Sequence, residues 1–479
     1  MKNPLIPSGF EDLTVLLIQL VYLLAVGMFI FGLKRLSSPA TAVSGNRMAS
    51  LAMFLAVIVT LFDQQILTFE YILAGVIVGS LIGVVLAKKV EMTSMPELVA
   101  VFNGFGGGAS ALVASAEYIR VPETGMFFTD IPVNVLVTMS ISVFIGSITF
   151  TGSLIAFAKL KGILSGNPLL FKGQKILNAL LAIGVAAATV MLVLDPANWI
   201  IYASIGGVSL LLGILFVIPI GGADMPVVIA LLNSLSGVAA SAAGFVIDNN
   251  ILIVAGALVG ASGLILTMIM CKAMNRTLTH VLFGGFGQEA TGLAMTSSDS
   301  SKTVREVSAD DLAMMTAYAK KVIIVPGYGL AVAQAQHVVR EVADQLEKRN
   351  VDVKYGIHPV AGRMPGHMNV LLAEANVPYP QLADMDEINP DFPKTDVVLV
   401  IGANDVVNPD ARTNPASPIY GMPILNVDEA RAVVVFKRSL NPGFAGIDNQ
   451  LFYNDNSYMF FGDAKKSLSS LLEALKEID

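Results

Sequence analysis

The chain has little cysteine and little charge for its 479 residues. Cys271 is its one cysteine, so an internal disulfide is excluded and a reducing compartment is expected. Only 14% of the residues are charged, against roughly 25% in an ordinary soluble domain. The net charge of −7 argues against nucleic-acid binding, which requires a basic surface. These shortages indicate a chain that is partly embedded in lipid.

Apolar runs fill the first part of the chain, and about 20 such residues are needed to cross roughly 30 Å of hydrocarbon. No basic region precedes the first run, so we expect it to stay as a membrane helix and not to be removed as a signal peptide. The sequence therefore predicts an α-helical membrane bundle of nine transmembrane helices. The predicted spans are residues 12–33, 49–66, 69–87, 98–117, 132–158, 176–194, 199–219, 224–246 and 250–272.

Basic residues between the spans predict the orientation of the bundle, because they favour the cytoplasmic side. Eleven stand in one set of alternate loops, and two stand in the other set together with the N-terminal tail. We therefore expect the N-terminus outside and the C-terminal part in the cytosol. The larger set is Lys34, Arg35, Arg47, Lys88, Lys89, Lys159, Lys161, Lys172, Lys175, Lys272 and Arg276, and the smaller is Lys2 and Arg120.

Beyond the last span the composition changes to that of a soluble protein. A segment rich in Gly, Ser, Thr and Asp comes first and leads into a capped helix at about 308–319. We expect a membrane domain at 1–275, a linker at 276–305 and a soluble domain at 306–479.

Polar residues inside the spans are costly unless they are paired or hydrated, so they mark a candidate proton path. The alternative is an interhelical hydrogen bond that serves packing alone, and the sequence leaves both open. None of the histidines (His280, His337, His358 and His367) lies inside a span. The polar candidates are Asn103, Ser153, Asn233, Ser234, Ser236 and, near a helix start, Asp224.

The soluble part begins with a strand-like run at 322–325, a glycine turn and a helical run to about 348. Gly327, Gly329 and Val332 match the dinucleotide fingerprint G-x-G-x-x-G only partly, since valine replaces the third glycine. Further strand-like runs follow, separated by helical or turn segments. They predict an α/β doubly wound parallel sheet of the Rossmann-like kind. The runs are 351–357, 396–401, 423–426, 432–436 and 458–461.

Ligands of such sheets bind at the carboxyl ends of the strands, so the residues after each strand indicate the cofactor. An NAD site needs an acidic residue about 20 positions past the fingerprint, and the run 351–357 ends without one. Lys437, Arg438 and Ser439 offer two cations and a hydroxyl that suit a 2′-phosphate. A solvated basic turn is the alternative. Together the two observations favour NADP(H).

No cysteine, serine–histidine pair or metal-binding cluster appears in these loops. This pattern is typical of hydride transfer, where the nicotinamide carries the chemistry and the protein positions it. One dinucleotide site is visible, whereas a hydride needs both a donor and an acceptor. A partner that supplies the second site is therefore expected.

Seven motifs are spread over nearly the full length of the chain: Val90–Thr93 with Met95–Ala100, Gly221–Pro226, Met270–Arg276, Gly327–Gln336, Gly356–Ala375, Val400–Pro409 and Phe436–Ser439. Together they resemble the β subunit of proton-translocating NAD(P) transhydrogenase. The resemblance implies a bacterial inner-membrane enzyme in which NADP(H) binds to this chain and NAD(H) to a separate α subunit. It also implies hydride transfer driven by inward proton movement, and a dimer of αβ units.

The resemblance also implies the roles of individual residues. Asp405 would sense protonation, Lys437 and Arg438 would bind the 2′-phosphate, and Asp224, Asn233 and Arg276 would serve proton conduction and its coupling. Asn103 and Ser153 join the predicted proton path as polar residues inside the spans. The NADP(H) contacts would be Gly327, Tyr328, Gly329, Val332, Val360, Ala361, Gly362, Arg363, Met364, Pro365, Gly402, Ala403, Asn404, Asp405, Val406, Gly421, Met422, Lys437, Arg438, Ser439, Leu440, Asn441, Pro442, Gly443, Phe444, Asp463 and Ala464.

Two positions depart from the family pattern. Many members have a histidine where Asn103 stands, so the relay must come from water and Asn103 or from a partner chain's histidine. Many members also have a tyrosine at Phe444. The competing hypotheses are a transporter or channel regulated by a cytosolic NADP(H)-sensing domain, and a membrane scaffold with a vestigial nucleotide fold.

Overall fold

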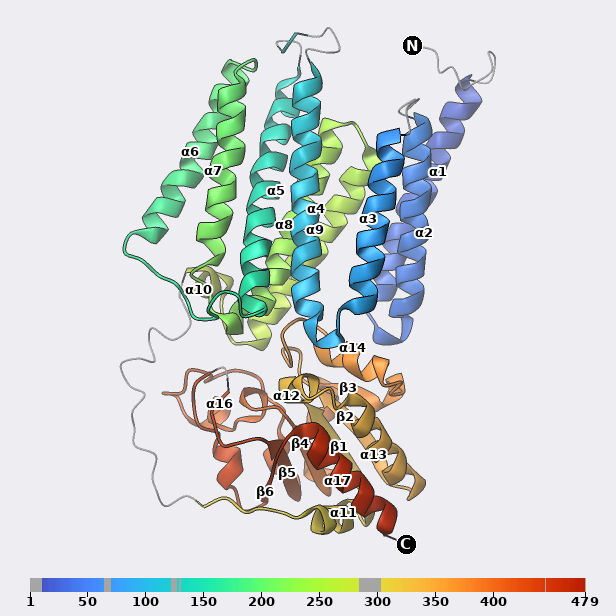
Figure 1. The fold of residues 1–479 in the computed structure, drawn as a ribbon, viewed down its shortest axis with the longest axis vertical. Helices are drawn as coiled ribbons and strands as arrows, with labels where there is room; N and C mark the ends of the chain where they lie inside the picture. The colour runs from blue at the N-terminus through green and yellow to red at the C-terminus, as the bar shows by residue number, and fades with distance from the viewer. Residues whose placement is uncertain are drawn as a thin grey trace.

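Long helices and a parallel sheet occupy separate layers of the computed structural model, the helices above and the sheet below in Figure 1. The structure describes residues 11–63, 70–121, 127–128, 131–283, 303–443 and 445–478. Most of the predicted linker, residues 284–302, lies outside them, as does Phe444.

Within these ranges, nine helices are long and apolar enough to cross a membrane. They confirm the predicted spans one for one. The largest difference is at α2, which begins ten residues before its apolar run because small and polar residues extend the helix beyond the hydrocarbon-length segment. The helices are α1 Glu11–Leu36, α2 Pro39–Asp63, α3 Glu70–Lys89, α4 Met95–Arg120, α5 Val133–Leu160, α6 Gln174–Leu194, α7 Trp199–Val217, α8 Met225–Val246 and α9 Asn250–Ala273.

Small residues bring α8 and α9 close together, as the glycine spacing predicts. A Cβ added at Gly237 would lie 2.3 Å from the Gly260 nitrogen, and one at Gly256 would lie 2.4 Å from the Ser241 nitrogen. Neither position therefore admits a larger side chain without moving the helices apart. This contact places α8 at the centre of the bundle, where it packs on α4 and α5 as well.

The soluble part is built on a six-stranded sheet whose order is β3-β2-β1-β4-β5-β6, with every neighbouring pair parallel. Alternate residues of each central strand face opposite sides, so both faces are buried. One face packs on α11, α13 and α17, and the other is covered by short helical turns and loops. The strands are β1 Lys321–Pro326, β2 Asp352–Ile357, β3 Leu382–Asp384, β4 Val397–Ile401, β5 Ala432–Lys437 and β6 Ser457–Phe461; the helices are α11 Ala309–Ala317, α13 Gln336–Lys348 and α17 Ala464–Glu477.

Two predictions for this part were wrong, and one strand was missed. The run 423–426 is not a strand but an irregular segment, whose apolar pattern reflects the burial of Ile424 and Leu425 in two separate clusters. The edge strand β3 was not predicted, because its three residues are too few to show a pattern. The predicted continuous helix after the glycine turn is interrupted between α12 (Tyr328–Val332) and α13, where Gln334 has a φ of +49°.

The carboxyl ends of the strands face the lower ends of the nine long apolar helices described above (Figure 1). Polar contacts join the two layers. The Arg363 guanidinium donates to the Leu160 carbonyl of α5 at 3.0 Å, and the Asn275 amide donates to the Tyr420 carbonyl at 2.8 Å. The Gln334 amide donates to Glu91, which precedes α4, at 2.9 Å. The edge of the sheet that carries the predicted site is therefore the edge that contacts the helices.

Candidate functional site

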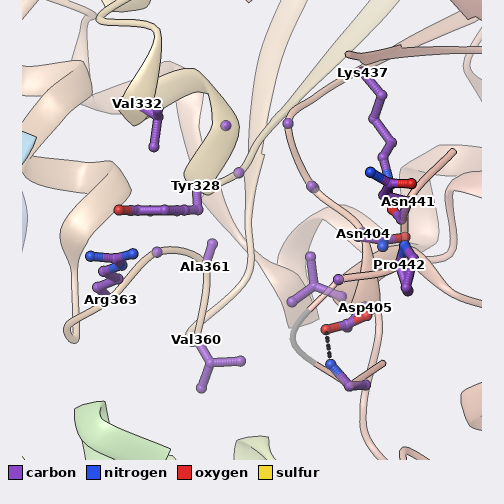
Figure 2. Close-up of a pocket in the computed structure, with 18 of the residues that line it drawn as sticks. Tyr328, Val332, Val360, Ala361, Arg363, Asn404, Asp405, Lys437, Asn441 and Pro442 are labelled. Atoms are coloured by element: carbon purple, nitrogen blue, oxygen red, sulfur yellow. Dashed lines mark hydrogen bonds between the residues drawn. The ribbon is translucent and has the colours of Figure 1, made fainter. Parts of the chain in front are cut away.

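A cavity of about 760 Å³ lies between the carboxyl edge of the sheet and the lower ends of the helices. Figure 2 shows its two sides, with Tyr328 and Arg363 on one and Lys437, Asn404 and Asp405 on the other. Its size falls in the range of small-molecule and cofactor sites. The loops after β1, β2, β4 and β5 all reach it, so the sheet alone brings together residues that lie more than a hundred positions apart.

Two glycine turns cross at the floor of the cavity. A Cβ at Gly327 would lie 2.4 Å from the Ala403 nitrogen, and a Cβ at Gly402 would lie 2.4 Å from the Gly329 Cα. Gly402 also has a φ of +67°, a backbone conformation that favours glycine. The Gly329 N–H donates to the Gly402 carbonyl at 3.0 Å. The loops after β1 and β4 thus touch backbone to backbone, which requires glycine on both.

Arg363 stacks on Tyr328 at one side of the cavity, with its guanidinium carbon 4.3 Å from the ring centroid. Burial raises the pKa of the Tyr328 phenol, although the nearby guanidinium opposes the rise. The same Arg363 side chain lies 3.8 Å from the Glu97 carboxylate at the start of α4 and bonds to the end of α5. It therefore joins the wall of the cavity to the two helices that carry Asn103 and Ser153.

His358 holds the turn after β2 in place. Its Nδ1 accepts from the Val360 N–H at 3.2 Å, and its Nε2 lies 2.8 Å from the Pro423 carbonyl. Because a carbonyl only accepts, Nε2 carries the proton and the ring is neutral. Burial lowers the pKa of His358 to about 4, which keeps the ring neutral around pH 7. The backbone that presents Val360 to the cavity is thus fixed by a structural histidine.

Asp405 lies on the opposite wall, where its Oδ2 accepts from the Ala445 N–H at 3.0 Å (dashed in Figure 2). The Asn449 amide donates to both the carbonyl and the side-chain oxygen of Asn404, at 3.1 and 3.0 Å. These bonds attach the loop after β4 to the segment after β5. A Cβ at Gly443 would lie 2.6 Å from the Asp405 Oδ1, so a larger residue there would displace the Asp405 side chain.

Lys437 ends β5 beside this wall. Its ammonium donates to the Asn441 carbonyl at 2.7 Å and lies 4.9 Å from the centroid of the Phe452 ring. Burial lowers the pKa of Lys437, and the Asp405 and Asp448 carboxylates oppose this effect. Arg438 is exposed at the rim. Two cations and the Ser439 hydroxyl consequently meet at one end of the cavity, a donor set that suits a phosphate group.

Most of the predicted contacts line this one cavity. Among the described residues, four do not: Met364, Pro365, Gly421 and Leu440 lie outside its wall. Phe444 lies outside the described residues. Those that line it are Gly327, Tyr328, Gly329, Val332, Val360, Ala361, Gly362, Arg363, Gly402, Ala403, Asn404, Asp405, Val406, Met422, Lys437, Arg438, Ser439, Asn441, Pro442, Gly443, Asp463 and Ala464.

Several lining residues were missed by sequence reasoning. Ala333, Pro418, Ile419, Phe436, Ala445 and Gly462 belong to the sheet part, and each is adjacent to or close to a predicted contact. Gly222, Pro226 and Met274 come from the helical part. No local pattern marks these three as cavity residues, because only the packing of the two layers brings them to the site.

Asn103 forms a hydrogen-bonded group between three of the central helices. Its amide donates to the Ser153 hydroxyl of α5 at 3.1 Å, and its side-chain oxygen accepts from the Ser236 hydroxyl of α8 at 2.7 Å. Asn233 is half-buried on α8, one turn from Ser236. Ser234 instead donates to the Gly260 carbonyl at 2.6 Å and serves the contact with α9. Asn103, Ser153 and Ser236 thus form one hydrogen-bonded group among α4, α5 and α8, whereas Ser234 forms a separate bond to the backbone of α9.

Asp224 and Arg276 form an ion pair at the lower end of the bundle. The guanidinium Nη1 lies 3.0 Å from Oδ2 and 3.2 Å from Oδ1 of the carboxylate, which is 1% exposed. Burial raises the pKa of the Asp224 carboxyl, and Arg276 opposes part of that rise. Arg276 also lines the cavity. The buried Asp224 carboxylate is therefore linked to the cavity through a single residue, Arg276.

Comparison with known proteins agrees with this geometry. The family model described as NAD(P) transhydrogenase beta subunit matches residues 18–474. The NAD(P) transhydrogenase subunit beta of Rhodospirillum rubrum is 48% identical over 455 residues, which cover 95% of this chain and 98% of the relative. The protein of that name from a strain of the same species matches equally. The chain with the glycine-lined cavity and the buried ion pair therefore belongs to the NAD(P) transhydrogenase beta subunit family.

Proposed function

We propose that this chain binds NADP(H) in the cavity and conducts protons through its helices, as one subunit of a proton-translocating transhydrogenase. Hydride passes between NADP(H) here and NAD(H) on a partner α subunit, coupled to inward proton movement. Residues 1–275 form the membrane domain, 276–305 the linker and 306–479 the cytosolic nucleotide domain. The chain acts in the bacterial inner membrane with its N-terminus outside, in a dimer of αβ units.

The strand order supports the cofactor assignment. The order 3-2-1-4-5-6 is that of Rossmann dinucleotide-binding sheets, whose ligands lie where the order reverses. Here that point lies between β1 and β4, and the crossed glycine turns of Gly327 and Gly402 stand there. Such turns let a pyrophosphate approach the backbone closely. The residues present thus fit a dinucleotide.

The charges at the rim support NADP(H) over NAD(H). The turn after β2 begins with His358, which is neutral and bonded to the backbone, and no carboxylate follows the strand. Lys437 and Arg438 stand at the other end of the cavity. A 2′-phosphate needs cationic donors, whereas a free ribose hydroxyl needs an acidic acceptor. When it is bound, the cofactor supplies the hydride chemistry, and these side chains bind and orient it.

The observation that carries the coupling is the position of Arg276. This residue forms a buried ion pair with Asp224 and at the same time lines the cavity with Asp405 and Lys437. A change of charge at the ion pair therefore acts directly on the nucleotide site, and a change in the nucleotide acts on the pair. Coupling of this kind is reciprocal by thermodynamic necessity.

The proposed function is tested by reconstituting the chain with its α subunit in sealed vesicles. Reduction of NADP⁺ by NADH is followed while the internal pH is recorded. Hydride transfer with a pH change, slowed by an opposing gradient, supports the coupled enzyme. Hydride transfer without proton movement retains the cofactor assignment and refutes conduction. NADP(H)-dependent flux of another solute, without hydride transfer, favours the regulated transporter.

Asp405→Asn is expected to weaken the pH dependence of NADP(H) affinity. Protonation of the wild-type carboxylate removes a negative charge from the wall of a cavity that receives an anionic dinucleotide, so affinity should rise as the pH falls. One linked proton changes affinity by up to about tenfold per pH unit. Asparagine keeps the acceptor for the Ala445 N–H and removes the charge.

Calorimetric titration with NADP⁺ at a series of pH values measures this effect. Asp410→Asn, which changes a carboxylate outside the cavity wall, is the matched control. A wild-type profile for Asp405→Asn would remove Asp405 from the coupling.

A further inference from the structure

His280 lies against the ion pair at the lower end of the helices. Its Nε2 is 3.2 Å from Nη2 of Arg276, whose other nitrogen binds Asp224. The ring is half-buried on the short helix α10 (Leu278–Phe283). Leu278 and Val281 of α10 pack into the apolar cluster that surrounds the start of α8. The helix is thus anchored, and the imidazole is held at the guanidinium.

The direction of the Arg276–His280 hydrogen bond defines the charge of the ring. A guanidinium donates and never accepts, so Nε2 accepts and the ring is neutral, with its proton on Nδ1. Protonation of Nε2 would replace an acceptor by a second donor and place two positive charges side by side. The contact can therefore exist only while His280 is neutral. Histidine is the side chain that ordinarily changes charge between about pH 5 and 8.

Within the part of the chain that the structure describes, the charged groups at this ring come from two segments. Arg276, four residues earlier, is in hydrogen-bond contact with the ring, and Asp224, from the turn before α8, pairs with the same guanidinium. The α10 residues on either side of the ring in sequence, Leu278 and Val281, belong to an apolar cluster that also holds Ile220 and Met225. Arg276, Asp224 and His280 together have a net charge of zero when the ring is neutral and +1 when it is protonated.

The hydrogen-bonded group around Asn103 contains no such side chain. None of the four histidines falls within the nine long helices that the structure describes, and Asn103 cannot take up a proton near neutral pH. Ser153 and Ser236, its hydrogen-bond partners, cannot either. A proton that crosses this group must therefore be received by a titratable side chain beyond it. At the end where the nucleotide cavity lies, the described candidates are Glu97, which lies 3.8 Å from Arg363, Lys159, which donates to two backbone carbonyls, Asp224, which pairs with Arg276, and His280, which contacts that pair.

We propose that His280 takes up and releases the transported proton at this end of the helices, in contact with Arg276 and Asp224. The inference rests on the proposed function, because it assigns one step of proton conduction. A proton from water adds to Nε2, the neutral imidazole becomes an imidazolium, and the hydrogen bond from Arg276 breaks. On release the proton returns to water at the other side and the hydrogen bond forms again. The step is a proton transfer only, and nothing is oxidised or reduced.

This step reaches the nucleotide through Arg276. Once the ring is charged, repulsion moves the guanidinium away from His280, towards Asp224 and the cavity that Arg276 lines. The cavity wall therefore gains positive charge when a proton is taken up and loses it on release. An anionic dinucleotide interacts differently with the two states, which couples nucleotide binding to proton transfer.

His280→Gln in the complete αβ complex tests the proposal in sealed vesicles. The glutamine amide keeps an oxygen acceptor for Arg276 but cannot titrate. We expect the rate of proton-coupled NADP⁺ reduction between about pH 5 and 8 to vary about tenfold less in His280→Gln than in the wild type, with any variation due to Asp405 retained. His337→Gln, on the exposed face of α13, is the matched control and should keep the wild-type profile.

A wild-type pH profile for His280→Gln would overturn the proposal. Failure of the wild type itself to couple hydride transfer to protons would refute the proposed function instead, so the two failures are distinguishable. A measurement on the wild type covers the case in which the variant does not assemble. Carbethoxylation of His280, followed by peptide mass spectrometry against pH, should have different midpoints with NADP⁺ and with NADPH. Identical midpoints would also overturn the proposal.

Discussion

Replacing Lys437 and Arg438 together by alanine is expected to abolish the preference for NADP⁺ over NAD⁺. Each lost charge-assisted hydrogen bond costs roughly 1.5–3 kcal/mol, or about 10–100-fold in affinity. The affinity for NAD⁺, which has no 2′-phosphate, should change little. Lys437 is held by the Asn441 carbonyl and the Phe452 ring, so its ammonium is already positioned before a ligand arrives. Competitive titration with the two nucleotides measures the preference.

Arg431→Ala is the matched control for this experiment. Arg431 lies at the start of the same segment, is exposed, and pairs with Asp396 at the opposite end of the strands. Its loss removes a positive charge and leaves the cavity intact, so the preference should remain. An unchanged preference in the double variant would place the 2′-phosphate elsewhere. An absence of NADP⁺ binding in the wild type would favour the scaffold with a vestigial nucleotide fold.

Asp224→Asn is expected to stop proton-driven transhydrogenation and to destabilise the protein. Removal of one partner of a buried ion pair costs about 3–5 kcal/mol, because the remaining charge is left without compensation. Arg276 would keep its positive charge at the end of the bundle and lose the carboxylate that positions it. The melting temperature in detergent measures the loss of stability, and the internal pH of vesicles measures proton movement.

The double variant Asp224→Asn with Arg276→Gln separates the two effects. Replacing both charged partners by neutral ones removes the uncompensated charge, so much of the stability should return. Proton movement should not return, since neither neutral side chain carries the coupling charge. Recovery of both properties in the double variant would mean that the pair serves stability alone.

Local patterns were enough to predict the membrane helices and the central strands. A span needs a run of apolar residues of a set length, and all nine predicted runs became helices in the described part of the chain. The central strands β1, β4 and β5 are buried on both faces, so each is a short run of valine and isoleucine that stands out from its surroundings. Where such a signal was absent, as for β3, or misleading, as for 423–426, the prediction failed.

Cavity residues could be predicted from the sequence only where they lie in a loop that directly follows a strand of the sheet. Glycines after a strand, and Lys437 with Arg438 after another, are visible in the sequence because a parallel sheet brings these loops to one edge. Gly222, Pro226 and Met274 have no such mark. The same limit applies to the hydrogen bond between Ser236 and Asn103, because the two residues lie 133 positions apart in the chain and on different helices.

By itself the sequence determined the length and number of the apolar spans, the parallel sheet and the residues at its carboxyl edge, because these depend on hydropathy and spacing along one segment. The tertiary structure alone decided that the sheet edge faces the helices, that Arg276 is shared between a buried carboxylate and the cavity, and that His280 contacts it. These relations depend on side chains from different segments meeting at hydrogen-bond distance, and no periodicity within a segment encodes such a meeting.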